Sequence, residues 1–271
     1  MGQALARPNI AKSLQVNPRL TIATFTHAAP PDSPFMFDYN SLQQLAAARR
    51  DAYAAAVPYP HTTIESFLPA DVAHNVAANI PRPGEDRKWD FFYAKGYEEK
   101  WAISDDASLP PETRTLVREF NSGSFVRFLE TLTGIPHLLP DPHLFGGGIH
   151  LVRRGGVLQV HSDFNWAEHL EAHRRVNMFV YLTPDWQESW GGALELWDAA
   201  CKEKVCEYPP LFNRLVVFSS RSDTFHGHPH PLECPDGVYR QSIAMYYYTT
   251  TRPEGEIRTP HNTLYKGYHI T

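Results

Sequence analysis

From Gly147 onward, the chain alternates short apolar runs with turn residues. Runs of this length, bounded by Gly, Pro, Asn and Asp, are typical of β-strands. The runs are 149–152, 157–160, 177–182, 193–197, 214–218 and 240–249. The separators are 154–156, 189–192, 212–213 and 235–237, and all of them have the composition of turns. Several strands at this spacing favour a β-sandwich, a jelly roll or a barrel.

The segment from residue 38 to about residue 134 has helical patterns instead. Helices are predicted over 41–56, over 69–80, from residue 110 onward and over 122–134, with strands at 62–67 and 89–93. We therefore expect a mainly β fold with flanking helices. The predicted division is an N-terminal extension (1–37), a helical support layer with accessory strands (38–145), a β core of the same domain (146–252) and a tail (253–271).

Composition excludes several classes of protein. The formal net charge of −5 gives no basic surface for nucleic acid, and no apolar run approaches the length of a membrane span. The first 20 residues lack the apolar stretch of a secretory signal. The three cysteines form no disulfide or zinc pattern, so we interpret them as reduced thiols. These features predict a cytoplasmic protein without nucleic-acid or membrane partners.

The histidines suggest a metal site. Seven of the 14 lie between residues 150 and 230, and histidine is the commonest metal ligand. His161 and Asp163 follow an apolar run, and residues i and i+2 of a strand face the same side. A second histidine, at His226 or His228, would complete the two-histidine, one-carboxylate set of non-haem Fe(II) oxygenases.

A candidate anion-binding residue begins the last apolar run. Arg240 shares a strand face with Ser242, and an inward-facing arginine is costly unless an anion meets it. A guanidinium binds a carboxylate through two parallel hydrogen bonds. The alternative is an edge-strand arginine in a surface salt bridge.

Seven motifs occur together in one order. They are Gly147-Gly148-Ile149-His150, the segment 155–165 around His161-Ser162-Asp163, the segment 175–182, Trp190-Gly191-Gly192, the segment 213–218, Phe225-His226-Gly227-His228 and Arg240-Gln241-Ser242. In this order the chain resembles the 2-oxoglutarate- and Fe(II)-dependent oxygenases of the prolyl-4-hydroxylase type. The resemblance implies a double-stranded β-helix, a cupin-like jelly roll with N-terminal helical support.

The resemblance also implies roles for individual residues. His161, Asp163 and His226 would bind Fe(II). The family's spacing from the preceding strand favours His226 over His228, which would then orient a ligand or cap the pocket. Arg240 and Tyr181 would hold the distal carboxylate of 2-oxoglutarate, with Ser242 as a further contact. Tyr181 could instead be a core aromatic residue, and Ser242 a packing residue. O₂ would be the second co-substrate, and ascorbate is a candidate reductant.

The implied reaction is hydroxylation of an unactivated C–H bond, coupled to decarboxylation of 2-oxoglutarate to succinate and CO₂. A prolyl or other peptidyl residue and an amino-acid-like small molecule are both candidate substrates. Two alternatives stay open, namely a non-catalytic jelly-roll module that binds a metal or a sugar, and an oxygenase that performs desaturation or cyclisation.

Two further segments are candidates for contact with the substrate. The polar segment 164–175 is either a loop that closes over the substrate or a solvated turn. The aromatic segment 89–93 could line a cleft, although a strand within the core is favoured.

Overall fold

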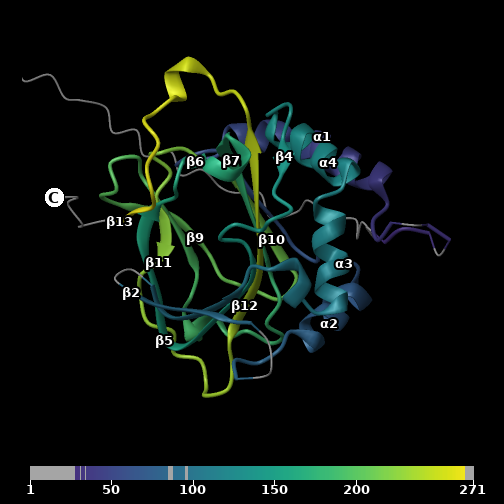
Figure 1. Ribbon diagram of the computed structural model, residues 1–271, viewed down its shortest axis with the longest axis vertical. Coiled ribbons are helices and arrows are strands. Elements are labelled where there is room, and N and C mark those ends of the chain that lie inside the picture. The colour runs from purple at the N-terminus through teal and green to yellow at the C-terminus, as the bar shows by residue number, and fades with distance from the viewer. Residues whose placement is uncertain (1–27, 31, 34, 85–87, 95–96, 266–271) are drawn as a thin grey trace, which may run out of the picture.

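The computed structural model describes residues 28–265 except for 31, 34, 85–87 and 95–96. Most of the predicted N-terminal extension and the last six residues of the predicted tail lie outside the described residues. Thirteen strands form one sheet in the described part of the chain, and its main order is β1-β10-β7-β12-β5-β11-β8-β9. The sheet curls into a half-barrel (Figure 1), which is the predicted double-stranded β-helix.

All strand pairs of the described sheet are antiparallel. The four central strands are β5 (Gly148–Ser162), β7 (Ala172–Tyr181), β10 (Arg214–Ser219) and β12 (Arg240–Thr249). The others are β1 (His61–Ile64), β2 (Asp90–Ala94), β3 (Tyr97–Ile103), β4 (Leu139–Pro140), β6 (Trp166–Ala167), β8 (Leu194–Trp197), β9 (Lys204–Tyr208), β11 (His226–His228) and β13 (Leu264–Tyr265).

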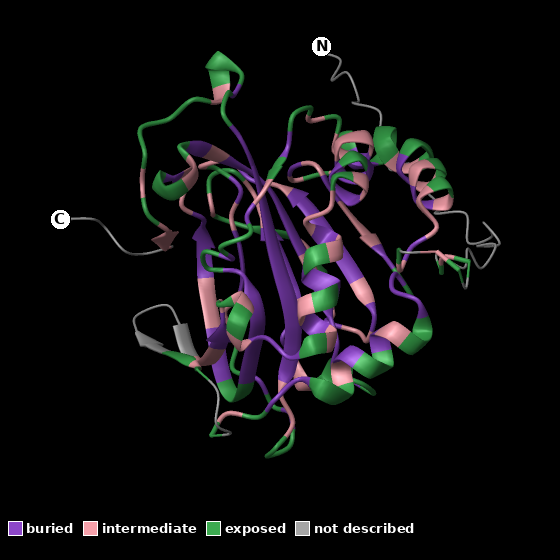
Figure 2. Ribbon diagram, turned by 45° about the vertical axis from the view of Figure 1, so that its right-hand side comes forward, coloured by how far each residue is buried: buried purple, intermediate pink, exposed green. Residues whose placement is uncertain are grey.

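In the described part of the chain, four α-helices cover one face of the sheet, with their exposed sides turned to solvent (Figure 2). They are α1 (Tyr39–Ala54), α2 (Ala70–Asn79), α3 (Pro111–Phe120) and α4 (Gly123–Thr133), close to the predicted ranges. Local sequence explains their ends. Asp38 caps α1 by accepting hydrogen bonds from two backbone amides, and Ser122 caps α4 while Gly134 ends it in the left-handed conformation. Apolar residues of these helices and of the central strands share one core.

Strand β5 corrects one sequence prediction. Residues 154–156 were expected to form a turn between two strands, but β5 continues through them. Gly155 has a φ of +79°, a conformation that bends the strand without ending it. Before the bend β5 pairs with β12, and after it β5 pairs with β11. One strand therefore carries residues of both ends of the cavity described below.

Two other sequence interpretations are wrong in part. The aromatic strand at 89–93 was favoured as part of the core, but Phe91 is 51% exposed. Its strand, β2, pairs only with β3 among the described strands, so it lies at the edge of the sheet. The segment 164–175 is not a single loop, because it contains β6 and the start of β7, and Arg174 within it is fully buried. No helix among the described residues is long and apolar enough to cross a membrane.

Candidate metal centre

Strand pairing brings the predicted ligands together. His161 lies at the end of β5, Asp163 follows directly, and His226 begins β11. His226 is the antiparallel partner of His161, with a distance of 4.4 Å between the ring centroids. The two histidines are 65 residues apart in the sequence, so only the sheet register makes them neighbours.

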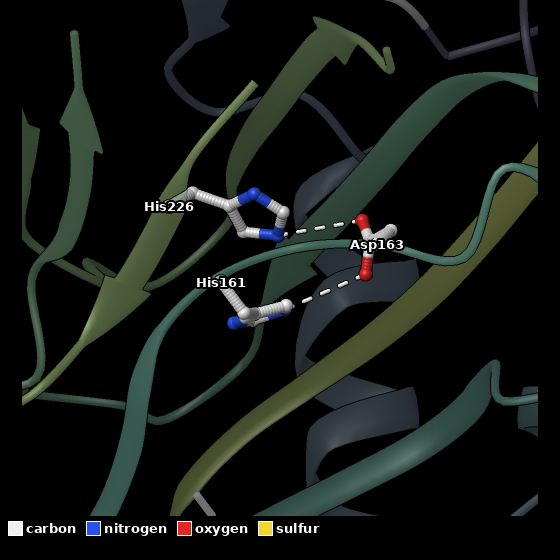
Figure 3. Close-up of side chains that lie close together, drawn as sticks. All are labelled: His161, Asp163 and His226. Carbon is white, nitrogen blue, oxygen red and sulfur yellow. Dashed lines mark ion pairs between the residues drawn. The ribbon is translucent and has the colours of Figure 1, made fainter. Parts of the chain in front are cut away.

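The three side chains converge on one point (Figure 3). The Nε2 atom of His161 lies 3.4 Å from Oδ1 of Asp163, and Nε2 of His226 lies 3.5 Å from Oδ2. One potential ligand atom from each residue lies within 4.8 Å of the other two, and all three residues are buried. Among the described residues, these three form the only cluster of this kind. Two imidazoles and one carboxylate are a donor set that suits Fe(II) and leaves coordination positions open.

Backbone hydrogen bonds orient both imidazoles. Nδ1 of His161 lies 2.8 Å from the carbonyl oxygen of Gln159, and Nδ1 of His226 lies 3.2 Å from that of Thr224. Because a carbonyl can only accept a hydrogen bond, each Nδ1 must carry the proton and donate it. Each Nε2 then has a free lone pair directed at Asp163, which is the tautomer that a metal ligand requires.

His228 is not part of this cluster. It pairs with Leu158 rather than with His161, after an irregularity in the strand register. Its side chain is buried, and neither ring nitrogen has a hydrogen-bond partner within the described structure. Burial, followed by the nearby Arg240 and Lys100, lowers the pKa of His228 well below its usual value.

The surrounding charges and burial set protonation states of the cluster that favour cation binding. Burial alone would raise the pKa of the Asp163 carboxyl, but Arg174 and the two histidines hold it well below its usual value. Burial lowers the pKa of His226 to about 4, against the opposing effect of Asp163. Near neutral pH the carboxyl is therefore ionised and His226 is neutral, and these are the protonation states that bind a metal ion.

Two supporting residues escaped the sequence analysis. Asn177 donates a hydrogen bond of 2.6 Å to Oδ2 of Asp163, and Arg174 lies 3.1 Å from the same oxygen. Arg174 also donates to Oδ1 of Asn177 and stacks on the ring of Tyr246 at 3.6 Å. Both residues lie on β7, three positions apart, and face the same side only because the β7–β12 register shifts between them. The sequence spacing gave no sign of this shift.

We expect Asn177→Leu to weaken metal binding by about ten- to a hundredfold, as is usual when a group that orients a ligand is lost. The leucine has a similar volume but cannot hold the carboxylate in place. Titration of the apo protein with Mn(II), followed by calorimetry, measures the change. Asn75→Leu, on the outer side of α2, is the control, and equal affinities for both variants would contradict a role for Asn177.

A cavity extends from the cluster to Arg240 and includes all the predicted co-substrate residues. Arg240, Tyr181 and Ser242 line it, together with His150. Arg240 is buried, and it donates hydrogen bonds to the carbonyl of Gly192 at 2.8 Å and to the Tyr181 hydroxyl at 3.1 Å. No carboxylate among the described residues forms a salt bridge with Arg240, so its charge faces the cavity uncompensated. The predicted alternative of a surface salt bridge is wrong.

The mouth of the cavity opens into a wider groove. The two share Phe164 and Thr263, and the groove continues along Phe145, Trp166 and His169. Part of the segment 164–175 therefore borders the approach to the cluster, whereas Arg174 lies inside. Lys100, which the sequence analysis did not identify, also lines the cavity, and burial lowers its pKa to about 8 despite the opposing effect of Asp163.

Comparisons with known proteins agree with this architecture. Residues 147–248 match the 2OG-Fe(II) oxygenase superfamily. A prolyl hydroxylase from Trichoplax adhaerens, solved with a hypoxia inducible factor peptide fragment, is 16% identical with a TM-score of 0.56 over 77% of this chain and 91% of that chain. A Pseudomonas putida prolyl-4-hydroxylase is 20% identical, with a TM-score of 0.54 over 76% and 99%.

The structure of SnoN, an α-ketoglutarate-dependent epimerase from nogalamycin biosynthesis, is 14% identical with a TM-score of 0.51 over 86% of this chain and 96% of that chain. No match was found among curated proteins. At these identities the structures establish the shared fold. The resemblance predicted from the sequence is thus confirmed: residues 147–248 of this chain match the 2OG-Fe(II) oxygenase superfamily.

Proposed function

We propose that the protein is an Fe(II)- and 2-oxoglutarate-dependent dioxygenase that hydroxylates an unactivated C–H bond. One observation carries the proposal. The cluster of His161, Asp163 and His226 and the buried Arg240–Tyr181 pair line the same cavity. A 2-oxoacid with a second carboxylate fits both groups. Its oxoacid end would chelate a metal at the cluster, and its other carboxylate would pair with Arg240.

The donor set favours iron over a structural metal. Structural zinc sites are closed by four protein ligands, whereas this cluster offers three among the described residues. His161, Asp163 and His226 would hold the ion on one side. When bound, Fe(II) supplies the activation of O₂ for C–H oxidation, with 2-oxoglutarate converted to succinate and CO₂.

The residues of the chain position the co-substrate. Arg240 would pair with its distal carboxylate, the Tyr181 hydroxyl would donate a hydrogen bond to the same group, and Ser242, next to Tyr181 across the β7–β12 ladder, would add a further contact. A module that only binds metal or sugar does not require a buried, uncompensated guanidinium at the far end of the cavity.

We expect Arg240→Leu to weaken 2-oxoglutarate binding about ten- to a hundredfold, because a charge-assisted hydrogen bond contributes about 1.5–3 kcal/mol. Anaerobic titration of the Fe(II)-loaded protein with 2-oxoglutarate, followed by its visible charge-transfer band, measures this affinity. Iron binding should stay unchanged. Arg127→Leu, on the outer face of α4, is the control. If no band develops with folded, iron-loaded wild-type protein, the proposed function fails.

Product analysis is the test of which reaction takes place at the substrate carbon. Hydroxylation adds one oxygen atom from O₂ to the substrate, whereas desaturation, cyclisation and epimerisation do not. Mass spectrometry of products formed under ¹⁸O₂ distinguishes hydroxylation from the other three outcomes. Ascorbate as a reductant is tested by whether it prolongs turnover in the same assay.

A further inference from the structure

The cavity contains more positive than negative side chains. Its described lining includes three cationic residues, Lys100, Arg174 and Arg240, but only one carboxylate, that of Asp163. Arg174 is already paired with Asp163, and a divalent ion at the cluster would add further positive charge. Buried charge is unfavourable unless opposite charge compensates it. This cationic lining suits anionic ligands.

Strand register separates two of these cations. Lys100 on β3 and Arg240 on β12 both pair with Val152 of β5, one on each side of it. Directly paired residues face the same side of a sheet, and two strands span roughly 10 Å. Arg240 turns toward β7, where it donates to the Tyr181 hydroxyl. Lys100 lies on the opposite side of Val152, so the two cations can serve two different anionic groups.

A second observation points to a ligand near Lys100. His228 is 3% exposed, lines the same cavity and lies within electrostatic reach of both Lys100 and Arg240. Neither of its ring nitrogens has a hydrogen-bond partner within the described structure. Buried polar groups without partners are rare in native proteins, and each unmade hydrogen bond is costly. An imidazole N–H can donate to a carboxylate that enters the cavity.

We propose that Lys100 and His228 form a second anion subsite, which binds a carboxylate of the primary substrate beside the metal. The substrate class is then a small carboxylic acid that enters the cavity, rather than an internal peptide segment. This inference rests on the proposed function, because Arg240 is assigned there to the co-substrate. The same chemistry would also bind a carboxylate of 2-oxoglutarate, and the experiment separates the two sources.

The test uses Mn(II)-loaded protein saturated with 2-oxoglutarate, with propionate as the probe. Bound Mn(II) accelerates proton relaxation of any molecule held close to it, so the propionate methyl signal reports weak binding beside the metal without turnover. Lys100→Met should lower propionate affinity about tenfold or more, whereas Lys100→Arg should retain most of it. The exposed control Lys202→Met should match wild type.

His228 has its own pair of variants. His228→Leu should also lower propionate affinity, and His228→Gln should restore part of it because its amide can donate a hydrogen bond. The affinity of Mn(II), measured by calorimetry for each variant, should stay at the wild-type value. Partial recovery of propionate affinity in His228→Gln would show that the loss in His228→Leu does not come only from disturbed folding.

Three results would overturn the inference. Equal propionate relaxation in wild type and Lys100→Met would remove Lys100 from the subsite, and equal relaxation in wild type and His228→Leu would remove His228. If saturating 2-oxoglutarate abolishes the propionate effect and Lys100→Met weakens 2-oxoglutarate binding, the anion is the co-substrate. Failure of the proposed function gives a different result from failure of the subsite. In that case 2-oxoglutarate would not bind the Mn(II)-loaded wild-type protein. A propionate effect that depends on Lys100 would still establish the subsite.

Discussion

Asp163→Asn should abolish succinate formation and weaken metal binding by more than about 100-fold, beyond the effect of losing a supporting group. The asparagine keeps the size of the side chain but removes the carboxylate charge that lies 3.4–3.5 Å from both histidines. Calorimetric titration with Mn(II) measures the affinity, and succinate release with Fe(II) measures turnover. Wild-type affinity in this variant would exclude Asp163 as a ligand.

Asparagine is the informative replacement because alanine would add a second effect. Asp163 is the salt-bridge partner of Arg174, whose side chain is 2% exposed. Removing one partner of a buried pair typically costs about 3–5 kcal/mol. Both replacements remove the charge, but asparagine keeps an oxygen that accepts hydrogen bonds from Arg174 and Asn177, whereas alanine loses this acceptor as well. His226→Gln should lose the metal as Asp163→Asn does, whereas His228→Gln should keep it, and this comparison identifies the distal ligand.

Gly148→Ala should lower the free energy of unfolding by on the order of 4–5 kcal/mol, an exceptional loss for a single methyl group. Gly148 has a φ of +86°, and a Cβ there would overlap the carbonyl oxygen of Ile103. Ile103 pairs with the neighbouring Ile149 in the β3–β5 ladder, so the backbone could move only by breaking that ladder. Urea denaturation of the purified variant measures the loss.

Gly155→Ala is the matched control on the same strand. Gly155 has a similar φ of +79°, but a Cβ there would meet nothing within 4 Å. Only the left-handed conformation is then unfavourable, at roughly 1–2 kcal/mol. Equal losses for the two variants would mean that conformational strain, and not overlap with β3, decides the effect at Gly148.

The sequence was sufficient to predict the β core, because its strands alternate with turn residues over the whole segment. The cluster of His161, Asp163 and His226 was equally accessible, since Asp163 follows His161 by two residues at the end of β5 and His226 follows at a recognisable position. The bend at Gly155 was misread as a turn, because a Gly-Gly pair signals a chain reversal and a bent strand equally well.

Residues that reach the cavity only through the pairing of distant strands could not be predicted in the same way. Lys100 reaches the cavity only because β3 pairs with β5 at Val152, and its local sequence resembles an ordinary exposed strand. Arg174 lies in a segment with many polar residues, so the segment was interpreted as a loop over the substrate or a solvated turn, although Phe164 and Tyr246 cover the guanidinium. In both cases the deciding information is which strands are neighbours, and that depends on long-range pairing.

The ladder between His161 and His226 means that a bound ion would cross-link the chain across 65 residues. An ion that binds only the folded chain stabilises it by mass action, by about 2.7 kcal/mol when the free metal concentration is 100 times its Kd. The thermal midpoint of this protein should therefore depend on the free metal concentration. Under iron limitation, the free energy of unfolding would fall together with the population of active protein, so the same ion would supply both chemistry and part of the stability.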